Sequence, residues 1–225
     1  KKPTLKVTKR IIDPSSGTIA NATSGTFVFG VYEDAAATKP VKNEDGTDLT
    51  VTVNATNNSA VGTVTLPDAG KYYLKEISVS GRNDLLASAM VYGPYTAARN
   101  GTVSTGTVLG GAGTIVNYMN RGRIVVVKTD AKTSKAISAR TSFMLIVEAD
   151  SVDAETAALL KANGFKQDAN IAGGHFYREQ STTNGSMTFS NVPQKFVGTE
   201  DFIKYTLKET GVPSGYIDEG FEQTG

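Results

Sequence analysis

A six-residue segment occurs twice in this chain with a single substitution. Lys71–Glu76 reads KYYLKE and Lys204–Glu209 reads KYTLKE, in otherwise dissimilar surroundings. The simplest interpretation is that one type of domain is used twice, each copy with its own core. A chain of 225 residues is long enough for two domains of ordinary size. We therefore expect a first domain over residues 1–121 and a second over residues 122–225, with the joint at Gly122.

The alternation within the repeated segment places a carboxylate on an apolar face. In a strand, Tyr72, Leu74 and Glu76 point to one side, and Lys75 points to the other. The second copy has the same pattern, which makes Glu209 the counterpart of Glu76. A glutamate facing a core is costly unless it is protonated, paired or hydrogen-bonded. Each copy should therefore contain a partner for it.

Short alternating segments separated by turn residues dominate the rest of the chain, and this predicts an all-β fold. The strands expected in the first domain are Leu5–Ile12, Phe27–Val31, Leu49–Val53, Val61–Leu66, Lys71–Glu76 and Thr114–Asn120, with weaker ones at Ala87–Tyr92 and Thr102–Leu109. Those expected in the second are Arg123–Asp130, Phe143–Val147, Met187–Phe189 and the repeated segment. This pattern is typical of two antiparallel, Ig-like β-sandwiches in tandem.

One helix is predicted, as an insertion in the second domain. Asp153–Asn163 reads DAETAALLKAN, in which Asp153 can cap the first turn and Gly164 can end the helix.

Three further polar residues share a face with apolar neighbours. Lys9 and Lys128 lie near the start of the two domains, and Asn117 lies at the end of the first. One interpretation is a buried Lys–Glu ion pair with a hydrogen-bonded asparagine nearby, since such networks are common structural features.

The alternative is a covalent bond. Burial lowers the pKa of a lysine and raises that of a carboxyl group. A neutral Lys9 amine could attack the Asn117 side-chain carbonyl, while protonated Glu76 donates a hydrogen bond to the carboxamide oxygen and polarises it. Ammonia would leave, and Glu76 would move the protons. The reaction would occur once, without turnover, so the chain would not be an ordinary enzyme.

The residues around these positions resemble a known family. VTKR with Lys9, VVVKTD with Lys128, and above all YTLKETGVPSGY from Tyr205 to Tyr216 are similar to CnaB-type (prealbumin-like) domains of Gram-positive pilins and surface adhesins. The last stretch is close to the pilin E-box, YxLxETxAPxGY, with Val212 in place of the usual alanine. The first copy departs from this pattern after Glu76, where it continues ISVSG.

The resemblance implies a self-formed Lys9–Asn117 isopeptide bond promoted by Glu76, with Lys128 and Glu209 in the equivalent places of the second domain. No asparagine follows Glu209, and Asp218 comes too soon after the Gly215-Tyr216 turn to be the second partner. Lys128 therefore has no visible partner, and we expect the second domain to lack its last strand within this sequence. Such an open edge would invite a strand from elsewhere.

Composition excludes several other functions. Net charge is +1, with basic and acidic residues scattered, so no nucleic-acid-binding or anionic-membrane surface is expected. No apolar run is long enough to span a bilayer, and no N-terminal signal region is recognisable. Cysteine is absent, and the single His175 has no second histidine to bind a metal with. We expect neither cofactor nor metal.

Two functions remain. The resemblance implies an extracellular structural shaft, either a pilin backbone subunit or an adhesin stalk, joined to other subunits or to the cell wall by a sortase. No LPxTG sorting signal and no pilin-motif lysine are recognisable in the sequence. The alternative is an adhesin module that binds a host protein or glycan, for which an exposed aromatic or apolar patch would be the distinguishing feature.

Overall fold

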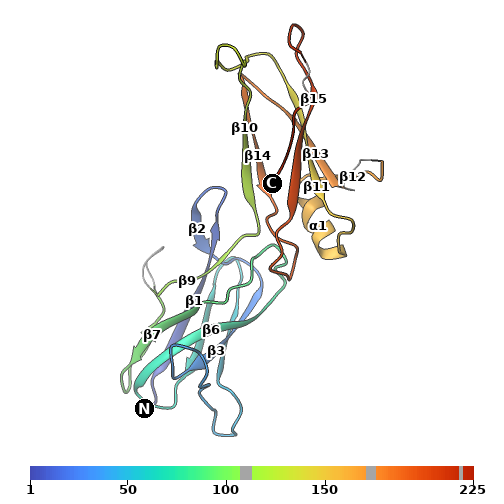
Figure 1. Ribbon diagram of the computed structural model, residues 1–225. Helices are drawn as coiled ribbons and strands as arrows, with labels where there is room; N and C mark the ends of the chain where they lie inside the picture. Colours follow the sequence, from blue (N-terminus) through green and yellow to red (C-terminus); the bar gives the residue numbers. More distant parts are fainter. Residues whose placement is uncertain (107–112, 171–175, 218–219) are drawn as a thin grey trace. The chain divides into compact units, whose positions relative to one another are not determined.

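The computed structural model describes residues 1–106, 113–170, 176–217 and 220–225. The chain forms two compact units, Lys1–Met119 and Asn120–Gly225. Both consist of strands, apart from one short helix in the second unit, so the predicted all-β class with a single helical insertion is confirmed (Figure 1). Within the described part of the chain, no helix is long and apolar enough to cross a bilayer.

The first unit is a sandwich of two sheets. One sheet contains β1, β2, β5, β8 and β9, and the other has the order β4-β3-β6-β7. The strands are β1 (Thr4–Asp13), β2 (Thr18–Asn21), β3 (Thr26–Tyr32), β4 (Thr50–Asn54), β5 (Val61–Thr65), β6 (Gly70–Ser80), β7 (Val91–Ala97), β8 (Thr102–Ser104) and β9 (Ile115–Tyr118). The alternating residues of the facing strands meet in one core, which includes Leu5, Val7, Phe27, Phe29 and Leu74.

Strand β1 is the central strand of its sheet, with neighbours on both sides. On one side it pairs antiparallel with β5 and then β2. On the other side it pairs parallel with β8 and then β9. The first and last strands of the unit are therefore direct neighbours, although they lie at opposite ends of its sequence.

The second unit also has two sheets. β10 pairs with β14, and a five-stranded sheet has the order β12-β13-β11-β15-β16. The elements are β10 (Gly122–Val127), β11 (Ser142–Glu148), α1 (Ala154–Ala162), β12 (Lys166–Gln167), β13 (Phe176–Ser181), β14 (Ser186–Val192), β15 (Lys204–Gly211) and β16 (Glu222–Thr224). Their core contains Val126, Phe143, Leu145, Phe189 and Leu160.

The helix begins as its sequence predicts. The Asp153 side chain accepts hydrogen bonds from the backbone N–H groups of Glu155 and Thr156, which would otherwise lack partners. Gly164 follows the last turn with a φ of 83°, a conformation that costs glycine little. Leu160 on the helix is fully buried, so the insertion contributes to the core of its unit.

Several strands differ from the sequence prediction. The weak strand expected over Ala87–Tyr92 is wrong for most of its length, because β7 begins only at Val91. The preceding segment instead lies against the last strand, where Leu86 N–H donates to the Tyr118 carbonyl at 2.8 Å. β13 and β16 were not predicted, since neither has a clear apolar alternation.

Candidate functional site

Lys9 lies in the middle of β1 on the side that faces the core, and it is fully buried. Residues directly beside β5 and β2 hold its backbone, because its N–H donates to the Ala60 carbonyl at 2.8 Å and its carbonyl accepts from the Ala22 N–H at 3.0 Å. Its ammonium nitrogen lies 5.2 Å from the centre of the Phe27 ring and 5.9 Å from that of Phe29. The aromatic faces offset part of the cost of burying the amine.

Glu76 projects into the same core from β6, in the opposite sheet, and its side chain is only 4% exposed. It lies directly across from Phe29 on β3. Immediately after it, the pairing with β3 skips Ile77, which is half exposed. This irregularity ends the regular alternation of buried and exposed side chains along β6 directly after Glu76.

Asn117 completes the cluster from β9, with a residue exposure of 1%. Its Cα lies opposite Ile11 of β1, two residues beyond Lys9 on the same face. Side chains in this diagonal relation are within reach of one another across neighbouring strands. Tyr92 fixes the strand further, because its hydroxyl donates to the Val116 carbonyl at 2.9 Å.

The three side chains are in contact. The Lys9 Nζ donates to Asn117 Oδ1. The Asn117 Nδ2 donates to Glu76 Oε1 at 2.8 Å and to the Leu86 carbonyl at 3.0 Å. Lys9 Nζ lies 3.7 Å from Glu76 Oε2, which accepts no hydrogen bond. The carboxamide therefore lies between the amine and the carboxylate, with each of its ends facing one of them.

The surroundings shift both titrating groups toward their neutral forms. Burial lowers the pKa of Lys9 from 10.5 to about 8, against the opposing attraction of Glu76. Burial likewise raises the pKa of Glu76 above 4.5, although the hydrogen bond from Asn117 and the charge of Lys9 oppose the shift. The two shifts bring the pKa values of Lys9 and Glu76 closer together, which lowers the free energy needed to move a proton between the two groups.

The orientation of the amide differs from the sequence-based mechanism in one respect. That mechanism has Glu76 donate a hydrogen bond to Oδ1 of Asn117. In the structure Glu76 instead accepts from Nδ2, while the Lys9 Nζ occupies the Oδ1 side. Glu76 is therefore placed at the nitrogen that would leave, and the Leu86 carbonyl holds the same NH2 group.

The second unit contains the same pair without the amide. Lys128 Nζ donates to Glu209 Oε2 at 2.6 Å, and their side chains are 26% and 4% exposed. Glu209 Oε1 is buried and accepts no hydrogen bond. Glu209 lies opposite Phe143, and the register then skips Thr210, as it skips Ile77 after Glu76.

The backbone contacts of the two lysines also correspond. Lys128 N–H donates to the Gly185 carbonyl at 2.8 Å, and the Lys128 carbonyl accepts from Ile137 N–H at 3.0 Å. These match in direction and length the bonds of Lys9 to Ala60 and Ala22. Lys128 therefore occupies the Lys9 position of its own unit.

Sequence reasoning missed the residues that hold the cluster in place. Phe27 and Phe29 were predicted only as residues of a strand, although two aromatic side chains on one face could have indicated a cation–π contact with the core-facing Lys9. The Leu86 carbonyl carries no sequence signal, since any residue could supply it. His175 and Asp218, both considered from the sequence, lie outside the described residues.

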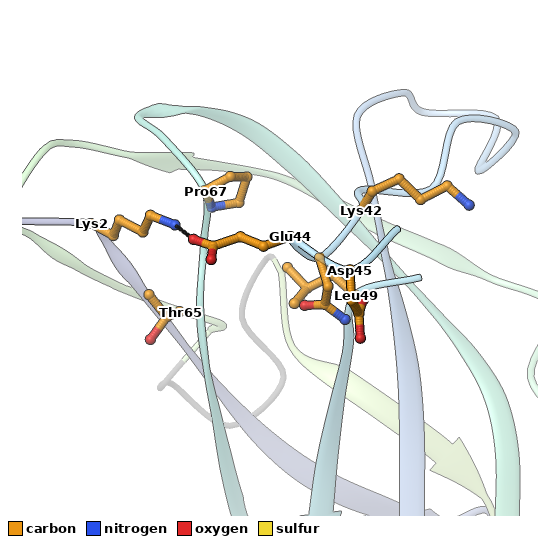
Figure 2. Close-up of a pocket in the computed structure, with 8 residues that line it drawn as sticks. Lys2, Lys42, Glu44, Asp45, Leu49, Thr65 and Pro67 are labelled. Atoms are coloured by element: carbon orange, nitrogen blue, oxygen red, sulfur yellow. Dashed lines mark hydrogen bonds and ion pairs between the residues drawn. The ribbon is translucent and has the colours of Figure 1, made fainter. Parts of the chain in front are cut away.

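The first unit also has a surface hollow, which none of the three cluster residues lines. It is lined by Lys2, Lys42, Asn43, Glu44, Asp45, Leu49, Thr65 and Pro67 (Figure 2). Lys2 Nζ donates to Glu44 Oε1 at 2.8 Å, but both side chains are largely exposed. Asp45 is held locally, because its side chain accepts a hydrogen bond from the Thr47 N–H at 3.0 Å within a tight turn. Exposed pairs of this kind are worth little, so we assign no function to the hollow.

Comparisons with known proteins give matches only among solved structures. No protein-family model and no curated protein matches the chain. The Bacillus anthracis TIE protein is 16% identical with a TM-score of 0.39, and the match covers 99% of this chain and 30% of that protein. A variant of the shaft pilin SpaA from Lactobacillus rhamnosus GG is 17% identical with a TM-score of 0.33, covering 100% of this chain and 94% of that one.

The major pilin from Streptococcus pyogenes is 16% identical with a TM-score of 0.35, and the match covers 93% of this chain and 83% of the pilin. At these identities and TM-scores the matches support no argument about function, which must rest on the cluster itself.

Proposed function

We propose that the chain is a structural cell-surface shaft protein whose first unit is braced by a self-formed isopeptide bond between Lys9 and Asn117. The observation that carries the proposal is the buried contact of the Lys9 amine with the Asn117 carboxamide, whose nitrogen is held by Glu76. The resemblance of both lysine segments and of Tyr205–Tyr216 to CnaB-type pilin domains supports the same conclusion.

The chemistry follows from the contacts. Neutral Lys9 attacks the carbonyl carbon of Asn117, so the Nζ–Cγ bond forms and the Cγ–Nδ2 bond breaks. One proton passes from Nζ to Nδ2, and ammonia leaves. Glu76 lies near both nitrogens, so its carboxyl group can donate a proton to the leaving nitrogen and recover one from the amine. The fold supplies proximity and excludes water, and the reaction proceeds once.

The bond would change how the unit bears load. Lys9 and Asn117 are 108 positions apart and lie on neighbouring parallel strands. By analogy with a disulfide, closing a loop of about 100 residues contributes about 5 kcal/mol through the unfolded state. Tension entering through one of these strands would pass to the other through a covalent bond, in a protein that has no cysteine to form disulfides.

The same proposal includes assembly. A shaft of this kind would be extracellular and joined by a sortase to other pilin subunits or to the cell wall, as the pilin resemblance implies. The protein would have no turnover activity, and Glu76 would act as the acid–base group of the first unit.

Intact mass spectrometry of the folded chain tests the bond. The parent should weigh less than its calculated mass by one ammonia, and a Glu76→Ala variant should have its full mass. Glu44→Ala serves as the matched control, because Glu44 is exposed and outside the cluster, and it should retain the deficit. A parent at full mass would reject the bond and leave a buried polar network.

A further inference from the structure

Asn120 is the first residue of the second unit, and it is almost entirely buried, with an exposure of 3%. Its side chain can donate two hydrogen bonds and accept two. The Oδ1 atom accepts from the Gln194 N–H at 3.0 Å and from the Lys195 N–H at 2.9 Å. The Nδ2 atom donates to the Lys195 carbonyl at 2.7 Å. The side chain thus binds the backbone of residues 194–195 as a neighbouring strand would.

A further contact holds the chain directly after Asn120. The Gln194 Nε2 donates to the Arg121 carbonyl at 3.0 Å. A Cβ added at Gly122 would lie 3.0 Å from the same Nε2, so the chain passes tightly against Gln194. Hydrogen bonds therefore join residues 120–121 to residues 194–195, just before the pair of Gly122 with Val192 that begins the β10–β14 ladder.

The segment that Asn120 holds is itself fixed to the other sheet and to the helix. The Tyr205 hydroxyl, on β15, donates to the Pro193 carbonyl at 2.7 Å. The Val197 N–H donates to the hydroxyl of Thr156 at 2.9 Å, and Thr156 is a fully buried residue of α1. A pull on Asn120 is therefore shared among β14, β15 and α1.

The position of these contacts matters if the chain is under tension. Strands β10 and β14 are antiparallel, and Gly122 pairs with Val192, so the start of β10 lies beside the end of β14. Tension that entered β10 directly would act first on this terminal pair, and a ladder loaded from one end opens pair by pair. The contacts of Asn120 come before that pair, and they are loaded together because one side chain makes them.

We propose that Asn120 is a mechanical clamp, which takes up tension arriving along the chain from Met119 and passes it to residues 193–197. The β10–β14 ladder is then not pulled open from its end, and α1 takes part through Thr156. This inference rests on the proposed shaft function, because only a protein under tension needs such a clamp. It requires no covalent bond, so it can be tested separately from the Lys9–Asn117 link.

Single-molecule pulling of the full chain at constant force tests the clamp. Because the chain contains no cysteine, introduced cysteines give unique attachment points. One form carries Lys1→Cys and Gly225→Cys, and the other carries Arg123→Cys and Gly225→Cys; all three positions are exposed. Tension passes through Asn120 in the first form and enters β10 beyond it in the second.

The second unit should unfold about ten times more slowly when pulled from residue 1 than from residue 123 at the same force. A factor of about ten corresponds to the net contribution of one to two hydrogen bonds. In Asn120→Ala the two rates should be equal, because no clamp precedes the ladder. A general loss of stability changes both rates alike, so the comparison separates a clamp from a merely structural asparagine.

Three further variants refine the test. Asn120→Asp keeps the acceptor for both N–H groups and should retain part of the difference between the two rates, which gives a second measurement should the alanine variant fold poorly. Thr156→Val should reduce the difference, because the Val197 N–H loses its partner. Asn170→Ala, at an exposed position outside the clamp, should leave it unchanged.

Equal unfolding rates of the parent from both attachment points would overturn the proposal, as would a tenfold difference that persists in Asn120→Ala. The length released by the first unit reports the covalent link separately. With Lys9 joined to Asn117, the chain between them cannot extend, whereas without the link it should lengthen by about 3.5 Å per residue. A full extension of the first unit would therefore reject the link, while the two rates of the second unit still decide on the clamp.

Discussion

Lys9 and Asn117 are in contact in the core of the first unit although 108 positions separate them in the chain. The contact arises because β1 and β9 run parallel as neighbours, with Asn117 opposite Ile11. A parallel pair of strands at the two ends of one unit needs the whole intervening sandwich as its connection. A covalent bond at this contact would therefore join the two ends of the unit directly.

Asn117→Ala should lower the free energy of unfolding of the first unit by at least about 5 kcal/mol. The variant cannot form the proposed link, which would contribute about that much for a loop of this length. It also removes the group that contacts both Lys9 and Glu76. Guanidinium chloride unfolding, followed by the amide signals of β3 and β6, measures the loss.

The comparison variant is Asn58→Ala, at an exposed position, which should change the free energy of unfolding by less than about 0.5 kcal/mol. If the parent has no link, Asn117→Ala should cost only about 1–3 kcal/mol, the usual effect of breaking buried hydrogen bonds. A loss in that smaller range would contradict the covalent brace.

Glu76→Gln should become more stable as pH rises from neutral toward 10.5. Without the carboxyl group the link should not form, so Lys9 remains a buried amine. The folded pKa of an unlinked Lys9 amine beside Glu76 is about 8, and in the variant it should fall further, because the attraction of Glu76 that raises it is gone. Between that folded pKa and 10.5 the unfolded state binds more protons than the folded state, and stability therefore increases with pH.

The measurement is urea unfolding across this pH range. The double variant Glu76→Gln, Lys9→Met has no amine to titrate at this place, and its stability should lack the Lys9-dependent increase. Equal pH profiles for the single and double variants would show that Lys9 is not held neutral by burial.

Lys9→Arg should abolish the ammonia deficit of the folded chain, whereas Lys128→Arg should retain it. Arginine keeps a positive charge but is not a nucleophile, because its guanidinium group stays protonated in proteins. Lys128 contacts only the carboxylate of Glu209 among the hydrogen-bonding side chains described around it, so it has no amide to attack. Peptide mapping of the parent and of Lys128→Arg should find a branched fragment joining residues 9 and 117, and mapping of Lys9→Arg should not. A deficit that follows Lys128 instead would reverse the assignment of the two units.

The core-facing positions of the cluster could be predicted because strand alternation has a period of two. Leu5, Val7 and Lys9 are buried along β1 as their spacing predicts, and Tyr72, Leu74 and Glu76 follow along β6. A polar residue in phase with apolar ones is a strong signal, since burying it needs a partner.

The remaining features had no comparable signal. The orientation of the Asn117 amide depends on the Leu86 carbonyl, which reaches the cluster only because the chain before β7 lies against β9. β16 has three exposed residues and no apolar alternation, so only its pairing with β15 identifies it as a strand. Backbone contacts made by distant segments are set by the tertiary fold and not by local sequence.

Asp153→Ala should destabilise the helix of the second unit by about 1 kcal/mol, the usual cost of losing an N-terminal cap. The Asp153 carboxylate accepts from the N–H groups of Glu155 and Thr156. Hydrogen bonding with the Thr156 side chain, and then these backbone contacts, lower the pKa of Asp153 below 3.8. A depressed folded pKa means that the contribution of the cap to stability is present above pH 3.8 and is lost as pH falls through the folded pKa.

Amide hydrogen exchange within α1 should therefore be faster in the variant at neutral pH. The difference should disappear in acid, and Asp150→Ala, at an exposed position outside the helix, should leave exchange unchanged. A difference that persists below the folded pKa would mean that the cap acts without its charge.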